Sequence, residues 1–200
     1  MREVTVGTLA HVPNTGFGPR TTPWWGTLGF IALEGTGFAL AGGALLYLWA
    51  VNPEWPLSAP LPDYGLGTLI AVTLLVSLIP NHLTKRWAEQ ERLYLSRFGI
   101  LVMSLFGLFP LLVRWFEFSS LNVKWDDNAY GSAMWFLLGL HTTHLLTDVA
   151  ETLVLAVLMF TRHGSSGKRF SDVSDNAFYW DFVVISWLPI YALLYGLPQL

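Results

Sequence analysis

Four ionisable side chains interrupt an otherwise apolar stretch, LGLHTTHLLTDVAETL, at residues 138–153. They are His141, His144, Asp148 and Glu151. On a helix that turns roughly 100° per residue they lie at about 0°, 300°, 340° and 280°, so all four share one stripe about 80° wide. Imidazoles spaced i,i+3 can present two nitrogens to one metal ion, and carboxylates can complete such a site. The same side chains can relay protons or form hydrogen bonds inside a helix bundle.

A fifth ionisable group, Glu34, lies ten residues into the apolar segment WWGTLGFIALEGTGFALAGG. A rise of roughly 1.5 Å per residue places it about 15 Å deep in a membrane, near the midplane. A charge there costs on the order of 3 kcal/mol, so Glu34 must face protein or water or stay protonated. Such buried groups usually serve a function. The adjacent Gly35 lets another helix approach closely.

The residue types favour a packed polar stripe over a metal site. A di-metal helix bundle needs carboxylates and histidines on facing helices, with paired Glu-x-x-His motifs. Here the candidate ligands share one segment and no Glu-x-x-His occurs. We therefore expect His141 and His144 to form hydrogen bonds between helices and to bind no metal.

The composition points to lipid as the solvent. The 200 residues are 53% hydrophobic and 12% charged, with a mean hydropathy of +0.47. Soluble domains are normally about 25% charged. The net charge of −3 gives no indication of nucleic-acid binding. The absence of cysteine excludes disulfides, thiolate metal sites, iron–sulfur clusters and c-type haem attachment.

Five segments are long and apolar enough to cross a bilayer, which takes about 20 residues. They cover residues 24–49, 64–83, 98–116, 132–160 and 178–197. We predict an all-α membrane protein, a single transmembrane domain over residues 1–200 made of a bundle of five transmembrane helices, with a polar tail at residues 1–23. Residues 84–97 fit a short helix that continues past the membrane or a solvated connector, and we favour the connector.

Basic residues fall mostly on one side of this arrangement. Nine of the eleven Lys and Arg lie in the tail and in the second and fourth loops, and two, Arg114 and Lys124, lie on the other side. The positive-inside rule then places the N-terminus in the cytoplasm and the C-terminus outside. We expect Arg114 and Glu117 to form solvated ion pairs in an outer loop together with Lys124, Asp126 and Asp127.

Three stretches, in order, resemble the cytochrome c oxidase subunit III family, that is, subunit III of haem–copper terminal oxidases in its short five-helix class. In the first, WWGTLGFIALEGTGFALAGG, Glu34 matches the family's single buried glutamate. In the second, LLGLHTTHL, a Gly-x-His-x-x-His pattern is matched by Gly139, His141 and His144. The third, FYWDFVVISWLPIYALLYG, resembles the closing helix of the family through Tyr179, Trp180, Phe182, Val183 and Trp187.

The chain also departs from the family pattern. Asp181 stands where the family usually has histidine, and Val184 where it has aspartate. Asp148 and Glu151 stand where the family is usually small or apolar. We expect a cytoplasm-side proton-collecting or inter-helix hydrogen-bonding role for this acidic pair.

The resemblance implies an accessory subunit without a redox centre, in a complex that reduces oxygen with electrons from cytochrome c or quinol and pumps protons. Haem and copper would lie in partner subunits, since a catalytic subunit needs six histidine ligands and this chain has five histidines. Glu34, His141 and His144 would form the buried polar centre. Gly35, Trp180, Asp181 and Trp187 would serve the lipid cleft or subunit packing.

The implied partners are oxidase subunits I and II, a small subunit IV, bound phospholipid and a respiratory supercomplex, and the implied location is a bacterial cytoplasmic membrane, crossed several times. Two alternatives remain open. One is a subunit III-like component of a nitric oxide reductase complex. The other is a stand-alone membrane metalloenzyme that uses the fourth-span stripe and Glu34. A small transporter would want broken helices and repeats around a midplane site, and the sequence shows neither.

Overall fold

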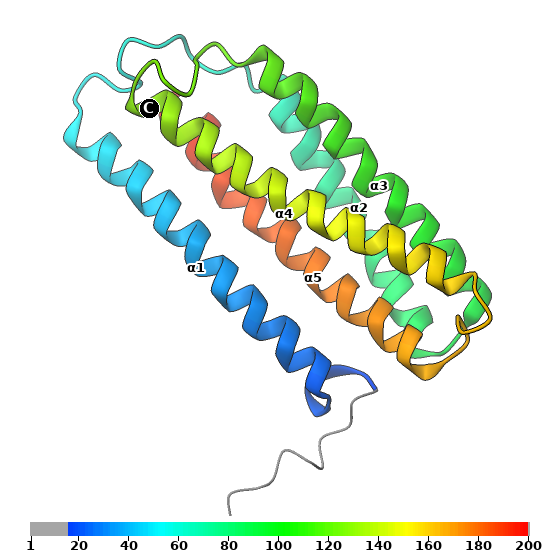
Figure 1. Ribbon diagram of the computed structural model, residues 1–200. Helices are drawn as coiled ribbons and strands as arrows, with labels where there is room; N and C mark the ends of the chain where they lie inside the picture. Colours follow the sequence, from blue (N-terminus) through cyan, green and yellow to red (C-terminus); the bar gives the residue numbers. More distant parts are fainter. Residues whose placement is uncertain (1–15, 200) are drawn as a thin grey trace, which may run out of the picture.

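Five long α-helices make up the protein in a computed structural model that describes residues 16–199 (Figure 1). They are α1 (Thr22–Val51), α2 (Gly65–Glu89), α3 (Leu93–Ser120), α4 (Ala129–Met159) and α5 (Gly167–Tyr191). A π-helical turn, Ala192–Gly196, and a 3-10 turn, Leu197–Gln199, continue α5. All five helices are long and apolar enough to span a membrane, which confirms the predicted all-α architecture of five such helices. Of the expected polar tail, residues 1–15 lie outside the described part of the chain.

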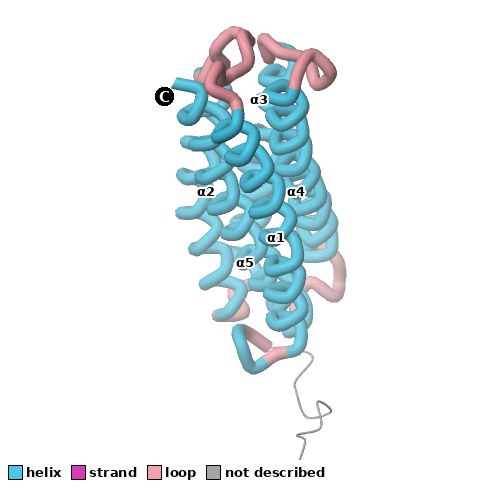
Figure 2. Tube along the Cα trace, turned by 90° about the vertical axis from the view of Figure 1, so that its left-hand side faces the viewer, coloured by secondary structure: helices cyan, strands magenta, loops and turns pink. Residues whose placement is uncertain are grey.

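The helices lie side by side with their long axes roughly aligned, and the loops lie at the two ends (Figures 1 and 2). Helix α2 packs against α3 and α5, and α4 also packs against α3 and α5. Helix α1 packs on α4 and α5 from one side. Most of its surface is exposed, including Leu33 and Leu40 at 71% each. An apolar helix this exposed requires lipid or another protein around it.

Residues 84–97 do not form the solvated connector that was expected. Helix α2 continues to Glu89 and α3 starts at Leu93, so only three residues separate them. Ala88 and Ser96 are buried in this region. Ala88 belongs to a small apolar cluster with residues of α3, α4 and α5. The segment contains many charged residues, but one side of it is apolar and packs against the neighbouring helices.

Small residues allow the helices to approach closely. A Cβ atom on Gly67 of α2 would lie 2.7 Å from the Tyr195 ring, and one on Gly107 of α3 would lie 2.5 Å from Val149 Cγ2 on α4. The large core cluster takes residues from all five helices, including Phe38 and Leu45 of α1, with the fully buried Trp187 within it. This shared core positions the polar side chains of the site.

Candidate functional site

Glu34 of α1 meets side chains of two other helices near the middle of the bundle. Its Oε1 lies 3.3 Å from Nε2 of His144 on α4. Its Oε2 accepts a hydrogen bond of 2.6 Å from the hydroxyl of Tyr179 on α5. The three residues tie α1 to the rest of the bundle through polar groups, which are strong contacts where little water competes.

The geometry at His144 fixes how many protons the Glu34 contact needs. His144 Nδ1 lies 2.7 Å from the carbonyl oxygen of Leu140, which only accepts, so Nδ1 carries a hydrogen. The contact from Nε2 to Oε1 is then attractive with one proton, held either by the carboxyl group or by the imidazole. The pair has no net charge in either state, which avoids the cost of a lone buried charge.

Asp148 lies one turn further along α4 and is 1% exposed. Its Oδ1 accepts a hydrogen bond of 3.2 Å from the Asn176 side chain, and Asn176 accepts one of 3.1 Å from Thr152. Its Oδ2 is buried and has no partner among residues 16–199. Buried polar atoms are rarely left unpaired, so this oxygen calls for a water or another donor. We refer to Glu34, His144, Tyr179 and Asp148 as the inner cluster.

Glu151 differs from the other three residues of its stripe, because it is exposed on the surface of the described chain. It borders three cavities of about 320, 240 and 540 Å³ that lie between α1, α4 and α5. The first also borders Glu34, His144 and Asp148, and the last reaches Arg169 and Asp172 near the start of α5. Together they lead from the end of the bundle at the α4–α5 loop to the inner cluster.

A second polar cluster corrects one expectation from the sequence. Arg114 and Glu117 are not in a solvated outer loop but lie within α3, each 1% exposed. Arg114 forms a short ion pair with Glu117, and the Tyr195 hydroxyl donates to the same carboxylate. The guanidinium also lies 4.2 Å from the ring centroid of Trp187, a cation–π contact.

His141 belongs to this second group. Its Nε2 lies 3.1 Å from the carbonyl oxygen of Val183 and so donates, which leaves Nδ1 to accept from Arg114 Nη2 at 3.4 Å. We refer to His141, Arg114, Glu117 and Tyr195 as the outer cluster. The two histidines thus serve different clusters. Residues 16–199 contain no group of three or more His, Cys, Asp or Glu placed to hold a metal ion.

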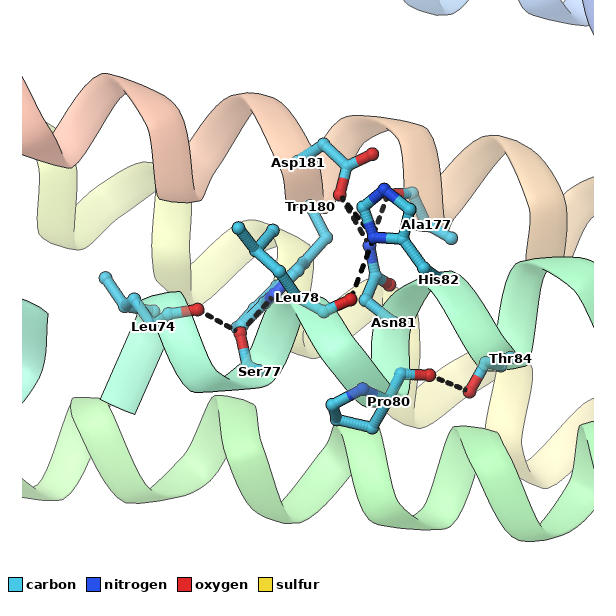
Figure 3. Close-up of polar contacts among 10 residues, drawn as sticks. All are labelled: Leu74, Ser77, Leu78, Pro80, Asn81, His82, Thr84, Ala177, Trp180 and Asp181. Atoms are coloured by element: carbon cyan, nitrogen blue, oxygen red, sulfur yellow. Dashed lines mark hydrogen bonds and ion pairs between the residues drawn. The ribbon is translucent and has the colours of Figure 1, made fainter. Parts of the chain in front are cut away.

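Asp181 and Trp180 lie at the contact between α5 and α2 (Figure 3). Asp181 Oδ1 accepts a hydrogen bond of 2.9 Å from Asn81 and lies 3.8 Å from His82 Nδ1. Trp180 donates from its indole nitrogen to the Ser77 hydroxyl at 2.8 Å. Asn81 also donates to the Ala177 carbonyl at 2.8 Å. These bonds hold α2 to α5.

The remaining predicted residues lie along the α1–α5 contact or in the core. A Cβ atom on Gly35 would lie 3.7 Å from Phe182, so α1 approaches α5 at this glycine. Beyond it, an apolar groove of about 460 Å³ runs between α1 and α5, bordered by Gly42, Leu46 and Leu193 among others. Trp187 is fully buried under Arg114.

The sequence reasoning missed several polar residues. Arg114 and Glu117 were named but misplaced, although an i,i+3 pair of opposite charges in the apolar run LFPLLVRWFEF is a signal for a buried pair. Asp175 and Asn176 on α5 are buried, and Asp175 Oδ2 has no partner within residues 16–199. No local spacing pointed to them, since their partners lie on other helices.

Five apolar helices of membrane-spanning length, with a shared apolar core and two polar clusters, define a helical membrane protein that crosses the bilayer several times. Comparison with known proteins identifies its family. A sequence model of the family described as cytochrome c oxidase subunit III matches residues 51–197. The chain therefore belongs to the cytochrome c oxidase subunit III family.

Relatives named cytochrome c oxidase subunit 3 support this assignment. The brine shrimp Artemia franciscana protein is 26% identical over 196 residues, which cover 92% of this chain and 71% of the relative. The fruit fly Drosophila yakuba protein is 24% identical over 184 residues, covering 86% and 68%. The elephant Loxodonta africana protein is 27% identical over 155 residues, covering 73% and 58%. The chain thus spans about six to seven tenths of the length of these relatives.

Proposed function

We propose that this chain is the accessory subunit III of a respiratory haem–copper terminal oxidase and that it stabilises the catalytic subunit. The family assignment carries this proposal, and the exposed apolar surface of α1 supports it, because such a surface can pack on another membrane subunit. The complex would reduce oxygen and pump protons, with this chain as a non-redox part. Its partners would be subunits I and II, a small subunit IV and, in a larger assembly, a respiratory supercomplex.

The proposed location is a bacterial cytoplasmic membrane with the N-terminus inside. The start of α1 and the α2–α3 and α4–α5 connections lie at one end of the bundle (Figure 1). Basic residues gather at that end, whereas Lys124 is the basic residue in the described loops at the opposite end. Arg114 is buried inside α3 and therefore does not count as a loop residue. The excess of basic residues in the loops at the first end is thus larger than the count from the sequence.

Haem and copper would be held by the partner subunits. Within residues 16–199, both buried imidazoles already have partners, His141 with Val183 and Arg114, and His144 with Leu140 and Glu34. Binding an iron or copper ion would require at least one of these contacts to break. The donor set of the chain therefore does not suit a haem or a dinuclear copper centre.

The three cavities that border Glu151 would support proton uptake from the cytoplasmic side of the membrane. Three cavities meet at Glu151 and lead to Glu34 and His144, a pair that can hold a proton. Asp148 and Asp175 border them with unpaired buried oxygens, which water can satisfy. A hydrated acidic path of this kind is suited to collecting protons.

A phospholipid acyl chain would lie in the apolar groove between α1 and α5. The groove is bordered mainly by glycines and by aliphatic and aromatic side chains, and it has a volume of about 460 Å³. An apolar space of this kind excludes water and suits a hydrocarbon chain.

The proton role is tested with Asp148→Asn combined with Glu151→Gln in the whole complex. We expect fewer protons taken up per electron, and a lower rate of oxygen consumption, because the path loses both carboxylates. The control is Asp126→Asn, an exposed carboxylate at the opposite end of the bundle. Unchanged oxygen consumption and proton stoichiometry in the double variant would refute the proton role while leaving the subunit assignment intact.

A further inference from the structure

The groove between α1 and α4 is lined on its α4 side by small and polar residues. Gly139, Thr143, Thr147 and Glu151 follow one another at intervals of four residues, which places them along one side of the helix. The two threonines and Glu151 are exposed in the described chain, and they border the cavity of about 320 Å³. Small residues of this kind line helix contacts in membranes, because they let a second helix approach closely.

The glycines of this groove have open space beside them. A Cβ atom added to Gly139, or to Gly37 on α1, would meet no other atom within 4 Å. Gly37 lies seven residues after Phe30 and so on the same side of α1, and Phe30 borders the cavity. By contrast, large apolar residues such as Ile79 and Leu105 make up the exposed sides of α2 and α3, as on a surface that faces lipid. The α1–α4 groove therefore differs from these sides in a way that suits a further helix.

Two carboxyl groups in the groove have no basic partner within residues 16–199. Asp148 is 1% exposed, borders the cavity, and has an Oδ2 without a hydrogen bond in the described chain. Glu151 forms no ion pair there either, and Arg169, beside the neighbouring cavity, is already paired with Asp172 at 2.6 Å. Glu151 lies eight residues before the end of α4, which is roughly 12 Å along the helix. Ionisable groups inside membrane helices usually pair with one another or face a cavity, so this groove calls for a positive charge.

We propose that the α1–α4 groove is the docking site for a transmembrane helix of a partner subunit, and that this helix presents a lysine or arginine side chain to Glu151 and Asp148. The cation would pair with the Glu151 carboxylate and donate to Asp148 Oδ2 through the cavity, in hydrogen bonds that charge strengthens. The inference rests on the proposed function, because the partner is another subunit of the proposed oxidase. It deepens that function by naming the face and the chemical group that the partner uses.

Two other occupants fit the groove less well. A lipid acyl chain has no donor for either carboxyl group, in contrast to its fit in the apolar groove between α1 and α5. A second copy of this chain would meet the groove with the same surface in a two-fold dimer, so that each Glu151 would lie near the Glu151 of the other copy. Like charges at such a contact repel.

The first test places a photoreactive benzophenone amino acid at Thr147 in the complex in its native membrane. We expect a cross-link to one membrane segment of a partner subunit, with a lysine or arginine within one helical turn of the modified residue. The control is the same probe at Leu105 on the exposed side of α3, which should not react with that segment. Both positions lie twelve residues from the helix end at the α2–α3 and α4–α5 connections.

Three results of this test overturn the inference: cross-links only to lipid, cross-links only to a second copy of this chain, or equal yields from both positions. The proposed function stands apart from these results. A complex that contains haem and copper while giving one of them would retain that function and lose the docking site.

A charge reversal tests the pairing itself. Glu151→Lys should lower the amount of partner subunit that co-purifies several-fold, because two cations would meet in the groove, whereas Glu151→Gln still forms hydrogen bonds and should retain most of it. Leu153→Lys is the control, because it adds the same charge two residues away, on the other side of α4. Changing the cross-linked basic residue of the partner to glutamate should restore co-purification with Glu151→Lys. Unchanged co-purification in Glu151→Lys, an equal loss in Leu153→Lys, or no recovery in the combined variant overturns the inference.

Discussion

Glu34 and His144 show how one proton can make a buried ionisable pair tolerable. The Leu140 carbonyl fixes the orientation of the imidazole, and the Tyr179 hydroxyl satisfies the second carboxyl oxygen. Either residue alone would be less favourable in the bundle, because an unpaired charge at the centre of a membrane helix costs about 3 kcal/mol on insertion scales. The pair joins α1 to α4 through a contact of 3.3 Å.

Tyr179→Phe should weaken the attachment of α1 to α5. The change removes the hydroxyl that donates to Glu34 Oε2 and leaves that oxygen without this donor, at a cost of about 1–3 kcal/mol. We expect a lower midpoint for thermal loss of this subunit from the purified complex. Tyr94→Phe, at an exposed position of α3, is the matched control. An equal midpoint for both variants would show that the hydroxyl contributes nothing.

Arg114→Met should destabilise the chain more than loss of the whole ion pair. The single change leaves the Glu117 carboxylate buried without its cation, which costs about 3–5 kcal/mol, whereas replacing both partners with apolar residues is often close to neutral. We therefore expect Arg114→Met with Glu117→Leu to unfold at a higher denaturant concentration than Arg114→Met alone. If the double variant were the less stable, the pair would not be the buried unit described here.

At this scale the sequence predicted the residue types of the site better than their partners. Glu34 and His144 stood out because charged and imidazole groups are rare in apolar segments. The helical stripe grouped His141 with His144. A stripe about 80° wide is nevertheless broad enough for the two side chains to contact different helices, so His141 contacts Arg114 and His144 contacts Glu34. Partners such as Asn176 and Tyr195 come from α5 and its extension, which no local spacing could reveal.

The number and order of the helices were predictable because membrane length and apolarity set them. Their ends were not, because amphipathic extensions such as residues 84–89 and 93–97 look like a loop when only charge is counted. The packing of α1 was also hidden. The residues of α1 are apolar on all sides of the helix. Only the structure shows that Phe38 and Leu45 face the bundle while Leu33 and Leu40 face outward.

Gly107→Ala tests the close approach of α3 to α4. The added Cβ would lie 2.5 Å from Val149 Cγ2, and the branched valine side chain has little freedom to move. Overpacking of this kind costs about 1–3 kcal/mol, so we expect a clear loss of stability in thermal unfolding. Adding Val149→Ala should recover part of it. Gly139→Ala on α4 has no atom within 4 Å of the new Cβ and should be neutral; a loss there as large as at Gly107 would contradict this account.

The whole molecule has one basic end, which sets its expected orientation in the membrane. Because the chain has no cysteine, a single introduced cysteine marks one position. With the N-terminus inside, Ser165→Cys in the α4–α5 loop should react with an impermeant maleimide only in inside-out vesicles. Asp126→Cys, in the loop between α3 and α4, should react only in right-side-out vesicles. The reverse pattern would refute the proposed orientation.

The chain belongs to the cytochrome c oxidase subunit III family, and it covers 68% and 58% of the length of the fruit fly and elephant relatives. The two clusters join its helices through polar side chains. The central claim is that the redox centres lie in partner subunits.

The most direct test is to extract the tagged chain gently from its native membrane and record a reduced-minus-oxidised spectrum with a metal analysis, then repeat both after its partners are removed. We predict haem and copper in the first preparation and neither in the second. Metal that remained in stoichiometric amount on the isolated chain would contradict the account and make a stand-alone metalloenzyme the better explanation.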